Sequence, residues 1–233
     1  PSGRKSSTMT SNFENMILAS AFRGLYRQPM RTLLVVIQTA MLLLSWQADA
    51  QQNIKRNNMG KENLKEIYLA GGCFWGTEHY FKQIDGVVDT EVGYANGTTE
   101  NPTYKDVCTD KTGFAETVHV IYNPVKVSLK FLLEMYFKAI DPTSINQQGH
   151  DTGTQYRTGV YYTDSTDEAT ISRVFDEEQK HIQGKIAVEN LPLKNFYTAE
   201  DYHQDYLDKN PDGYCHLPQS LFEFARKAKD TEK

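Results

Sequence analysis

The strongest constraint on the fold is an amphipathic segment that follows Ser128. Its apolar residues recur at the helical spacings i, i+3, i+4, i+7, i+8 and i+11. They are Leu129, Leu132, Leu133, Tyr136, Phe137 and Ile140. Ser128 offers an N-cap, and Asp141-Pro142 ends the pattern. A helix with one apolar face must bury that face, so the rest of the chain has to supply a partner layer.

Short apolar segments predict that this layer is a small sheet. Strands are expected at 66–70, 88–94, 116–122, 160–162 and 186–188. Further helices are expected at 73–83, after a capping box formed by Ser165 and Glu168, and at 199–207. The turn-rich tail NPDGYCHLP is expected to be irregular. The mixed order of strands and helices favours an α+β domain in which helices cover a small sheet.

The first fifty residues are not expected to belong to this domain. A short basic start at Met30, an apolar run from Leu33 to Leu44 and the small residues around Ala50 predict a cleavable signal peptide within residues 1–50. The apolar run is shorter than a membrane span requires. Arg and Ser upstream also fit an organelle transit peptide. We therefore expect an exported protein, with an organelle such as the mitochondrion as the alternative, a flexible linker at 51–63 and one domain at 64–233.

Charge and cysteine content exclude some partners. The net charge of -5 argues against electrostatic binding to nucleic acid, which requires a basic surface. The 3 cysteines form no CxxC pair, so neither a disulfide scaffold nor a structural zinc site with closely paired ligands is expected. No metal site is predicted. His79, His119 and His203 are interpreted as surface groups or as neighbours of the site.

Cys73 is the first candidate for chemistry. It follows Gly71-Gly72 at the start of a predicted helix, where free backbone N–H groups and the helix dipole favour a thiolate. A small buried residue is the simpler interpretation. Phe74 and Trp75 come next and either line a pocket beside the sulfur or pack in the core.

Glu116 is the second candidate. Strand alternation places it on the same face as Val118, Val120 and Tyr122. It is either a solvated residue at the strand end or a desolvated carboxyl whose raised pKa lets it donate a proton near neutral pH.

Four sequence blocks together resemble the A-type peptide methionine sulfoxide reductases. They are GGCFWGTE at 71–78, NPTYKDVCTDKTGFAE at 101–116, GHDTGTQYRT at 149–158, and AEDYHQDYL ending at Leu207. The resemblance spans about 67–217, and GCFW is a highly specific signature. It implies a ferredoxin-like two-layer sandwich with a long irregular C-terminal segment. It also implies a protein-repair enzyme, expected to be a monomer, that reduces methionine S-sulfoxide, free or in oxidised proteins.

The resemblance also assigns roles to residues. Cys73 corresponds to the nucleophile, Glu116 to the acid, and Tyr104 and Tyr156 to hydroxyl donors toward the sulfoxide oxygen. The substrate-binding residues correspond to Phe74 and Trp75, which form an apolar pocket for the methyl group, and Asp151, which holds the substrate and a water network.

The same resemblance implies how the enzyme is recycled. Cys215 occupies the place of the cysteine that resolves the sulfenic acid of Cys73 as a disulfide, which thioredoxin or a similar dithiol then reduces, with no bound cofactor. Cys108, between Tyr104 and Glu116, is either structural, as the resemblance implies, or an alternative resolving thiol. Phe114 stands where the family usually carries His, which puts the hydrogen bonding around Glu116 and the pH dependence in doubt.

Three other functions share parts of this pattern. A cysteine hydrolase would use Cys73 with a histidine and Asp151 and would need that histidine for activity, whereas the reductase predicts no essential histidine. A thiol peroxidase would form the same sulfenic acid from peroxide. A non-catalytic binder of oxidised methionine would need neither Cys73 nor Cys215.

Overall fold

The computed structural model describes residues 64–233. The predicted targeting segment 1–50 and linker 51–63 lie outside the described residues. The helices are α2 (Phe74–Lys82), α3 (Tyr104–Val107), α4 (Leu129–Ala139), α5 (Glu168–Gln179), α6 (Tyr206–Lys209) and α7 (Gln219–Lys227). The strands are β1 (Lys65–Gly71), β2 (Val87–Ala95), β3 (Ala115–Tyr122), β4 (Gln147–Gln148), β5 (Asp151–Thr152), β6 (Thr158–Tyr162), β7 (Glu189–Pro192) and β8 (Phe196–Thr198). None of the helices in this range has the length and apolar character needed to cross a membrane.

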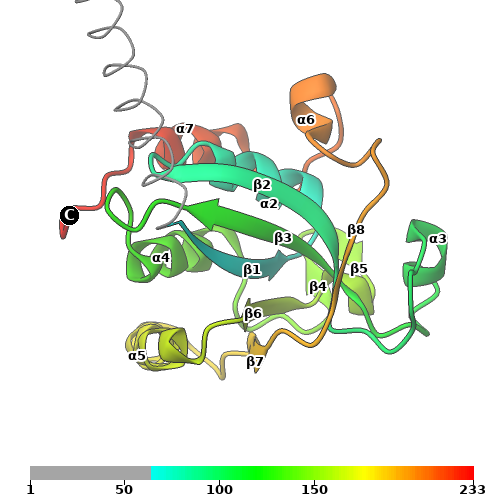
Figure 1. Ribbon diagram of the computed structural model, residues 1–233, viewed down its shortest axis with the longest axis horizontal. Coiled ribbons are helices and arrows are strands. Elements are labelled where there is room, and N and C mark those ends of the chain that lie inside the picture. The colour runs from blue at the N-terminus through cyan, green and yellow to red at the C-terminus, as the bar shows by residue number, and fades with distance from the viewer. Residues whose placement is uncertain (1–63) are drawn as a thin grey trace, which may run out of the picture. The chain divides into compact units, whose positions relative to one another are not determined.

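Six strands form one curled, mixed sheet in the order β7-β6-β1-β3-β2-β8 (Figure 1). The pair β6–β7 is parallel and the other neighbours are antiparallel. β4 and β5 form a separate two-stranded hairpin. Because β1 lies between β6 and β3, the turn that follows Gly71 leaves the middle of the sheet. The expectation of an α+β domain is confirmed.

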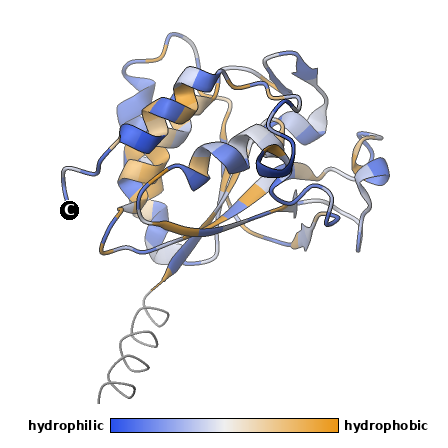
Figure 2. Cartoon of the chain, turned by 90° about the horizontal axis from the view of Figure 1, so that it is seen from above, coloured by the Kyte–Doolittle hydropathy of each residue, from blue (hydrophilic) through white to orange (hydrophobic). Residues whose placement is uncertain are grey.

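Helices α2 and α4 cover one face of the sheet (Figure 1). Alternate residues of β1 and β3 point into this layer and meet the apolar stripe predicted after Ser128. The fully buried members include Ile67, Leu69, Val118, Val120, Leu132 and Leu133. The helices show apolar and polar bands in Figure 2, as expected when only one side of each helix is buried.

The opposite face of the sheet carries a smaller apolar cluster. Tyr68, Ala70 and Tyr161 are buried there, and Leu193 and Phe196 of the C-terminal half pack against them. His119 stacks on Tyr68 with ring centroids 4.2 Å apart, so it is a packing residue of this face.

Local signals explain most element boundaries, and tertiary contacts explain the exceptions. The Ser128 hydroxyl accepts a hydrogen bond from the Phe131 N–H, which confirms the predicted cap of α4. The capping box expected at Ser165 is wrong, because the Asp164 side chain accepts the bond from the Thr166 N–H and a 3-10 turn precedes α5.

Three expectations for the C-terminal half also need correction. The strand expected at 186–188 forms instead at 189–192, as β7. The Ala187 N–H donates to the Pro142 carbonyl and is therefore not available to a neighbouring strand. The helix expected at 199–207 shrinks to α6, because Asp205 adopts a left-handed conformation with φ 54° while its N–H donates to Glu78. The irregular stretch predicted at 210–218 is confirmed, but the long irregular C-terminal segment implied by the resemblance ends there, because the unpredicted α7 follows and buries Phe222 beside α2.

Tyr136 links α4 to the turn that carries Cys73. Its hydroxyl donates to the Ala70 carbonyl at 2.7 Å, inside the core. Tyr136→Phe should lower the free energy of unfolding by about 1 kcal/mol, because a buried carbonyl loses its donor. Urea denaturation measures this change. Tyr202→Phe, at a residue that is 59% exposed, is the matched control and should change stability by less than about 0.5 kcal/mol. Equal losses in both variants would contradict the assignment.

Candidate active site

Cys73 lies at the turn between β1 and α2, directly before the first helical residue. Gly72 makes this turn possible, since its φ is +83° and a Cβ there would lie 2.6 Å from Cβ of Gln148. The Cys73 side chain is only 6% exposed and is a free thiol. The turn therefore presents a largely desolvated sulfur at the N-terminus of a helix.

The backbone N–H groups at the helix terminus favour the Cys73 thiolate, as predicted, but burial has the larger effect in the resting protein. Burial raises the pKa of the Cys73 thiol well above its usual value, and the nearby Glu116 carboxyl raises it further. Backbone N–H groups of Trp75 and Gly76 lower it, but they do not outweigh burial. The thiol therefore keeps its proton near neutral pH in the resting protein.

Glu116 lies inside the core layer rather than in solvent at the strand end. Its side chain is 1% exposed, and Oε2 accepts a hydrogen bond of 3.0 Å from the Phe74 N–H. This bond fixes the carboxyl against the residue that follows Cys73. The other oxygen, Oε1, is buried and has no partner among the described residues. It is free to donate or accept a bond toward a bound molecule.

Burial raises the pKa of Glu116 to about 8. The Phe74 N–H acts in the opposite direction, and Asp151 adds a smaller upward shift. At neutral pH the carboxyl is therefore mostly protonated. Because a protonated carboxyl is an O–H donor, this side chain fits the role of an acid beside the sulfur.

Tyr104 and Tyr156 approach the same region from different segments. Tyr104 begins α3, and Tyr156 ends a 3-10 turn after β5. Burial, followed by the Glu116 charge, raises the pKa of both hydroxyls. Both side chains therefore remain protonated donors throughout the physiological range, as the predicted role requires.

Phe74 and Trp75 form part of an aromatic cluster. Phe74 is 1% exposed and lies with its ring centroid 6.5 Å from that of Tyr104. Trp75 is partly exposed and stacks on Tyr206 at 3.7 Å. Phe74 is therefore a core residue, whereas Trp75 remains partly accessible at the edge of the cluster, and its predicted lining of a substrate pocket stays a prediction.

His203 belongs to this cluster. It is 1% exposed, so of its two predicted placements, a surface group or a neighbour of the site, the structure supports the second. Its Nδ1 accepts a hydrogen bond of 3.0 Å from the Trp75 indole, and its ring lies 4.6 Å from that of Tyr104. Burial lowers the pKa of His203. The neutral imidazole holds Trp75 in position.

Asp151 faces the site from the β4–β5 hairpin. The hydroxyl of Tyr214 donates to its Oδ1 at 2.9 Å, while the buried Oδ2 has no partner among the described residues. This contact joins the hairpin to the C-terminal strap, defined here as residues 210–217. Asp151 is therefore the point at which the strap is attached over the active-site turn.

Cys215, in the C-terminal strap, lies against the same face of α2 as Cys73. A Cβ added at Gly76, one helical turn after Cys73, would lie 2.9 Å from the Cys215 sulfur. The sulfur also accepts a bond from the Leu217 N–H and borders an open cavity of about 450 Å³ lined in part by Leu207 and Phe222. The two predicted redox cysteines are thus brought to one end of one helix.

Cys108 and Phe114 lie beside these groups. Cys108 caps the end of α3 and is exposed, so it packs into no core, and its predicted exclusion from the disulfide step stays a prediction. Phe114 is 1% exposed and meets Tyr197 edge-on at 5.7 Å. It supplies apolar surface where an imidazole would supply a hydrogen bond.

A buried thiol beside an un-ionised carboxyl and tyrosine hydroxyls, with a second free thiol on the same helix face, fits a thiol-dependent oxidoreductase. Geometry alone does not exclude a cysteine hydrolase, since a ring nitrogen of His216 and an oxygen of Asp151 both lie within 4.8 Å of the Cys73 sulfur. Comparison with known proteins distinguishes the two.

Residues 65–233 match the family described as peptide methionine sulfoxide reductase. The chain is 58% identical over 158 residues to the peptide methionine sulfoxide reductase MsrA of Clostridium acetobutylicum, covering 68% of this chain and 98% of that protein. It is 54% identical over 164 residues to the MsrA of Lachnoclostridium phytofermentans, covering 70% and 99%.

Solved structures of similar proteins indicate the same family as the sequence comparisons. Mxr1 from Saccharomyces cerevisiae in reduced form has 44% identity and a TM-score of 0.65, over 67% of this chain and 92% of that one. Methionine sulfoxide reductase A of Corynebacterium diphtheriae has 37% identity and a TM-score of 0.60, over 67% and 84%. The chain therefore belongs to the MsrA-type peptide methionine sulfoxide reductases and is a peptide-methionine (S)-S-oxide reductase.

The raised pKa of Glu116 predicts how stability depends on pH. Between about 4.5 and about 8 the unfolded carboxyl loses its proton while the folded one keeps it. The folded state then binds more protons, so this group lowers the free energy of unfolding as pH rises through that window. Glu116→Gln removes this pH dependence. The free energy of unfolding of the variant, relative to that of the parent, should therefore rise from pH 5 to pH 8 with the slope of about one titrating group and then level off.

Urea denaturation at several pH values measures this difference. Glu223→Gln, at an exposed position of α7, is the matched control and should give a flat difference. A flat difference for Glu116→Gln as well would show that the carboxyl titrates normally. In the reaction, the same variant should be slower by the roughly 10²–10⁴-fold that a lost general acid costs.

Proposed function

We propose that this enzyme reduces the S epimer of methionine sulfoxide, free and within oxidised proteins, by attack of the Cys73 sulfur on the sulfoxide sulfur. The observation that carries the proposal is the placement of Glu116, whose carboxyl is held by the Phe74 N–H next to the nucleophile, protonated near neutral pH, with a buried unpartnered oxygen. A sulfoxide becomes electrophilic at sulfur only when its oxygen is protonated or strongly hydrogen-bonded.

In the first step the sulfoxide oxygen receives hydrogen bonds from Glu116, Tyr104 and Tyr156, while the Cys73 sulfur bonds to the sulfoxide sulfur. The oxygen then transfers from the sulfoxide sulfur to the Cys73 sulfur: a Cys73 S–O bond forms, the sulfoxide S–O bond and the bond between the two sulfurs break, and methionine leaves Cys73 as a sulfenic acid. The balance is one sulfoxide plus one thiol giving one thioether plus one sulfenic acid, so the thiol proton ends on the sulfenic oxygen. The substrate methyl group fits the aromatic surface of Phe74 and Trp75, and Asp151 orients the substrate.

In the second step Cys215 attacks the sulfenic sulfur of Cys73. A disulfide bond forms, the S–O bond breaks, and the Cys215 proton leaves with the hydroxyl group as water. Support comes from the contact of the Cys215 sulfur with α2 at Gly76, one turn from Cys73. The segment between Asn210 and Pro218 forms no regular element, which leaves the backbone free to adjust.

A dithiol protein of the thioredoxin class then reduces the disulfide by thiol exchange. Members of this family work without a bound cofactor, and the chemistry above requires only thiols and proton donors. The cavity of about 450 Å³ beside Cys215 supports this step, since an incoming thiolate needs open access to that sulfur. We place the reductant there.

Three further features are proposed with the activity. The antiparallel order β6-β1-β3-β2, with α2 and α4 as connections on one face, supports a ferredoxin-like two-layer core extended by β7 and β8. The enzyme acts as a monomer.

Residues 1–50 direct export by a signal peptide that is cleaved after Ala50. The alternative is import into an organelle, which the Arg and Ser content of this segment suggests. Mass spectrometry of the mature N-terminus distinguishes the two.

Cys73→Ser should abolish methionine formation, because a hydroxyl does not replace the sulfur nucleophile. Chromatography of methionine released from methionine S-sulfoxide, with thioredoxin as reductant, measures the loss. Cys108→Ser is the matched control and should keep its activity, since that thiol is given no step. Residual activity of Cys73→Ser above a few per cent would remove the assignment.

Cys215→Ser should stop the cycle after the first step. With thioredoxin, the variant should release about one equivalent of methionine per enzyme and then stall with a sulfenic acid on Cys73. A small thiol such as dithiothreitol, which reaches the sulfenic acid directly, should restore turnover. Sustained turnover of this variant with thioredoxin would identify another resolving thiol.

A further inference from the structure

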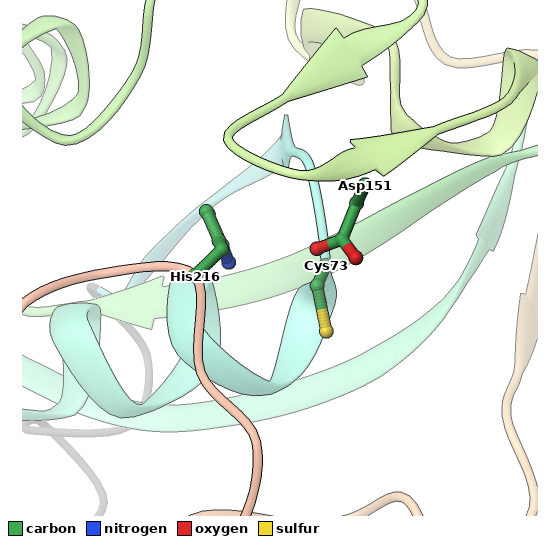
Figure 3. A group of neighbouring side chains, drawn as sticks. All are labelled: Cys73, Asp151 and His216. Carbon is green, nitrogen blue, oxygen red and sulfur yellow. The ribbon is translucent and has the colours of Figure 1, made fainter.

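Three side chains of metal-ligand type converge at the active-site turn. Cys73 comes from the turn before α2, Asp151 from the β4–β5 hairpin and His216 from the C-terminal strap (Figure 3). One sulfur, one carboxylate oxygen and one ring nitrogen of these residues lie within 4.8 Å of one another. Segments far apart in sequence thus bring three different donor atoms together.

The ring of His216 lies near the Gly71 backbone, but its nitrogens and one oxygen of Asp151 form no hydrogen bond of good geometry in the described fold. Both ring nitrogens of His216 and Oδ2 of Asp151 are buried and have no hydrogen-bond partner of acceptable geometry in residues 64–233. Unpaired buried polar atoms cost free energy, and folded proteins contain few of them. Three such atoms around one thiol indicate a site that accepts a ligand.

We propose that Cys73, Asp151 and His216 bind a divalent cation of the zinc type. The set of one sulfur, one nitrogen and one oxygen matches the ligands that zinc takes from cysteine, histidine and aspartate, and three protein ligands leave a fourth position for water. Thiolate and carboxylate together carry two negative charges, so the bound cation is neutralised, as a desolvated site requires. Magnesium and calcium, which prefer oxygen ligands, fit this set poorly.

The geometry requires only a small contraction. Zinc–ligand bonds of about 2.0–2.3 Å in a tetrahedron separate neighbouring ligand atoms by roughly 3.5 Å. The three ligand atoms now lie within 4.8 Å of one another, so metal binding would draw them together through side-chain rotation or a shift of the strap that carries His216.

Sequence spacing does not reveal this site. Structural zinc sites use closely paired ligands, and that criterion gave the prediction of no metal, whereas these ligands lie at positions 73, 151 and 216. Their scattered origin is typical of open zinc sites built at an active centre. Only folding brings the ligands together.

Zinc at this site blocks the reductase reversibly. Binding breaks the S–H bond of Cys73, forms a sulfur–zinc bond and releases the proton to solvent. The sulfur is then unavailable to the sulfoxide and to oxidants until a chelator or a stronger ligand removes the metal. This inhibitory effect rests on the proposed role of Cys73 as the nucleophile, but binding of the metal does not.

The experiment titrates the reduced full-length chain with Zn²⁺ and with Co²⁺, whose absorption reports a thiolate–metal bond. We expect one equivalent to bind, the Co²⁺–thiolate absorption to appear, and alkylation of Cys73 by iodoacetamide to slow. Methionine formation should stop and recover when EDTA is added. Mg²⁺ should have no effect.

Two variants distinguish this site from zinc held by a pair of thiols. His216→Gln should weaken Zn²⁺ binding by more than the roughly 10–100-fold that loss of an outer-sphere group costs, while its activity without metal remains. Cys215→Ser should keep both the Co²⁺ absorption and the protection of Cys73. Unchanged affinity in His216→Gln, or lost binding in Cys215→Ser, would overturn the proposal.

The binding readouts also separate this inference from the proposed function. If Zn²⁺ binds and protects Cys73 as expected but Cys73→Ser still forms methionine, the reductase mechanism fails and the metal site stands. If Cys73→Ser is inactive but Zn²⁺ affinity does not depend on His216, the metal site fails alone.

Discussion

The hydrogen bond from the Phe74 N–H to the Glu116 carboxyl is the interaction on which the rest of the site depends. It joins the first residue of α2 to the start of β3, across the interface between the helix layer and the sheet. Without it, a carboxyl that is 1% exposed would have no protein partner at all among the described residues. With it, one oxygen is held beside Cys73 and the other is left for chemistry.

Burial governs the protonation of both reactive groups. It raises the pKa of Cys73 and of Glu116 in the same direction, so the resting site holds two protons and little charge. The backbone N–H groups at the helix N-terminus lower the pKa of Cys73, but their effect is smaller than that of burial. A protonated thiol reacts slowly with adventitious oxidants. In the proposed mechanism, attack by Cys73 begins only when a bound sulfoxide has its oxygen hydrogen-bonded and its sulfur made electrophilic.

The parts of this structure that could be predicted are those determined by the local sequence pattern. The helix after Ser128, the strand of Glu116 and the turn at Gly71-Gly72 follow from periodicity, capping and glycine, and these elements place the nucleophile and the acid. The rest depends on contacts between distant residues. Asp205 breaks its expected helix by bonding to Glu78, His203 is buried by aromatic rings from three segments, and His216 reaches Cys73 only through the folded strap. No local sequence signal predicts contacts between residues that are so far apart in the chain.

Gly76 determines whether the Cys215 sulfur can lie against α2. Any side chain at this position would occupy the space that the Cys215 sulfur now fills, because even a methyl carbon would stand 2.9 Å from it. Displacing the strap would leave the nucleophile, the acid and the aromatic surface untouched. In the proposed cycle such a protein would reduce one methionine sulfoxide and then stay oxidised, so the missing carbon atom at position 76 is what would let the proposed enzyme act more than once.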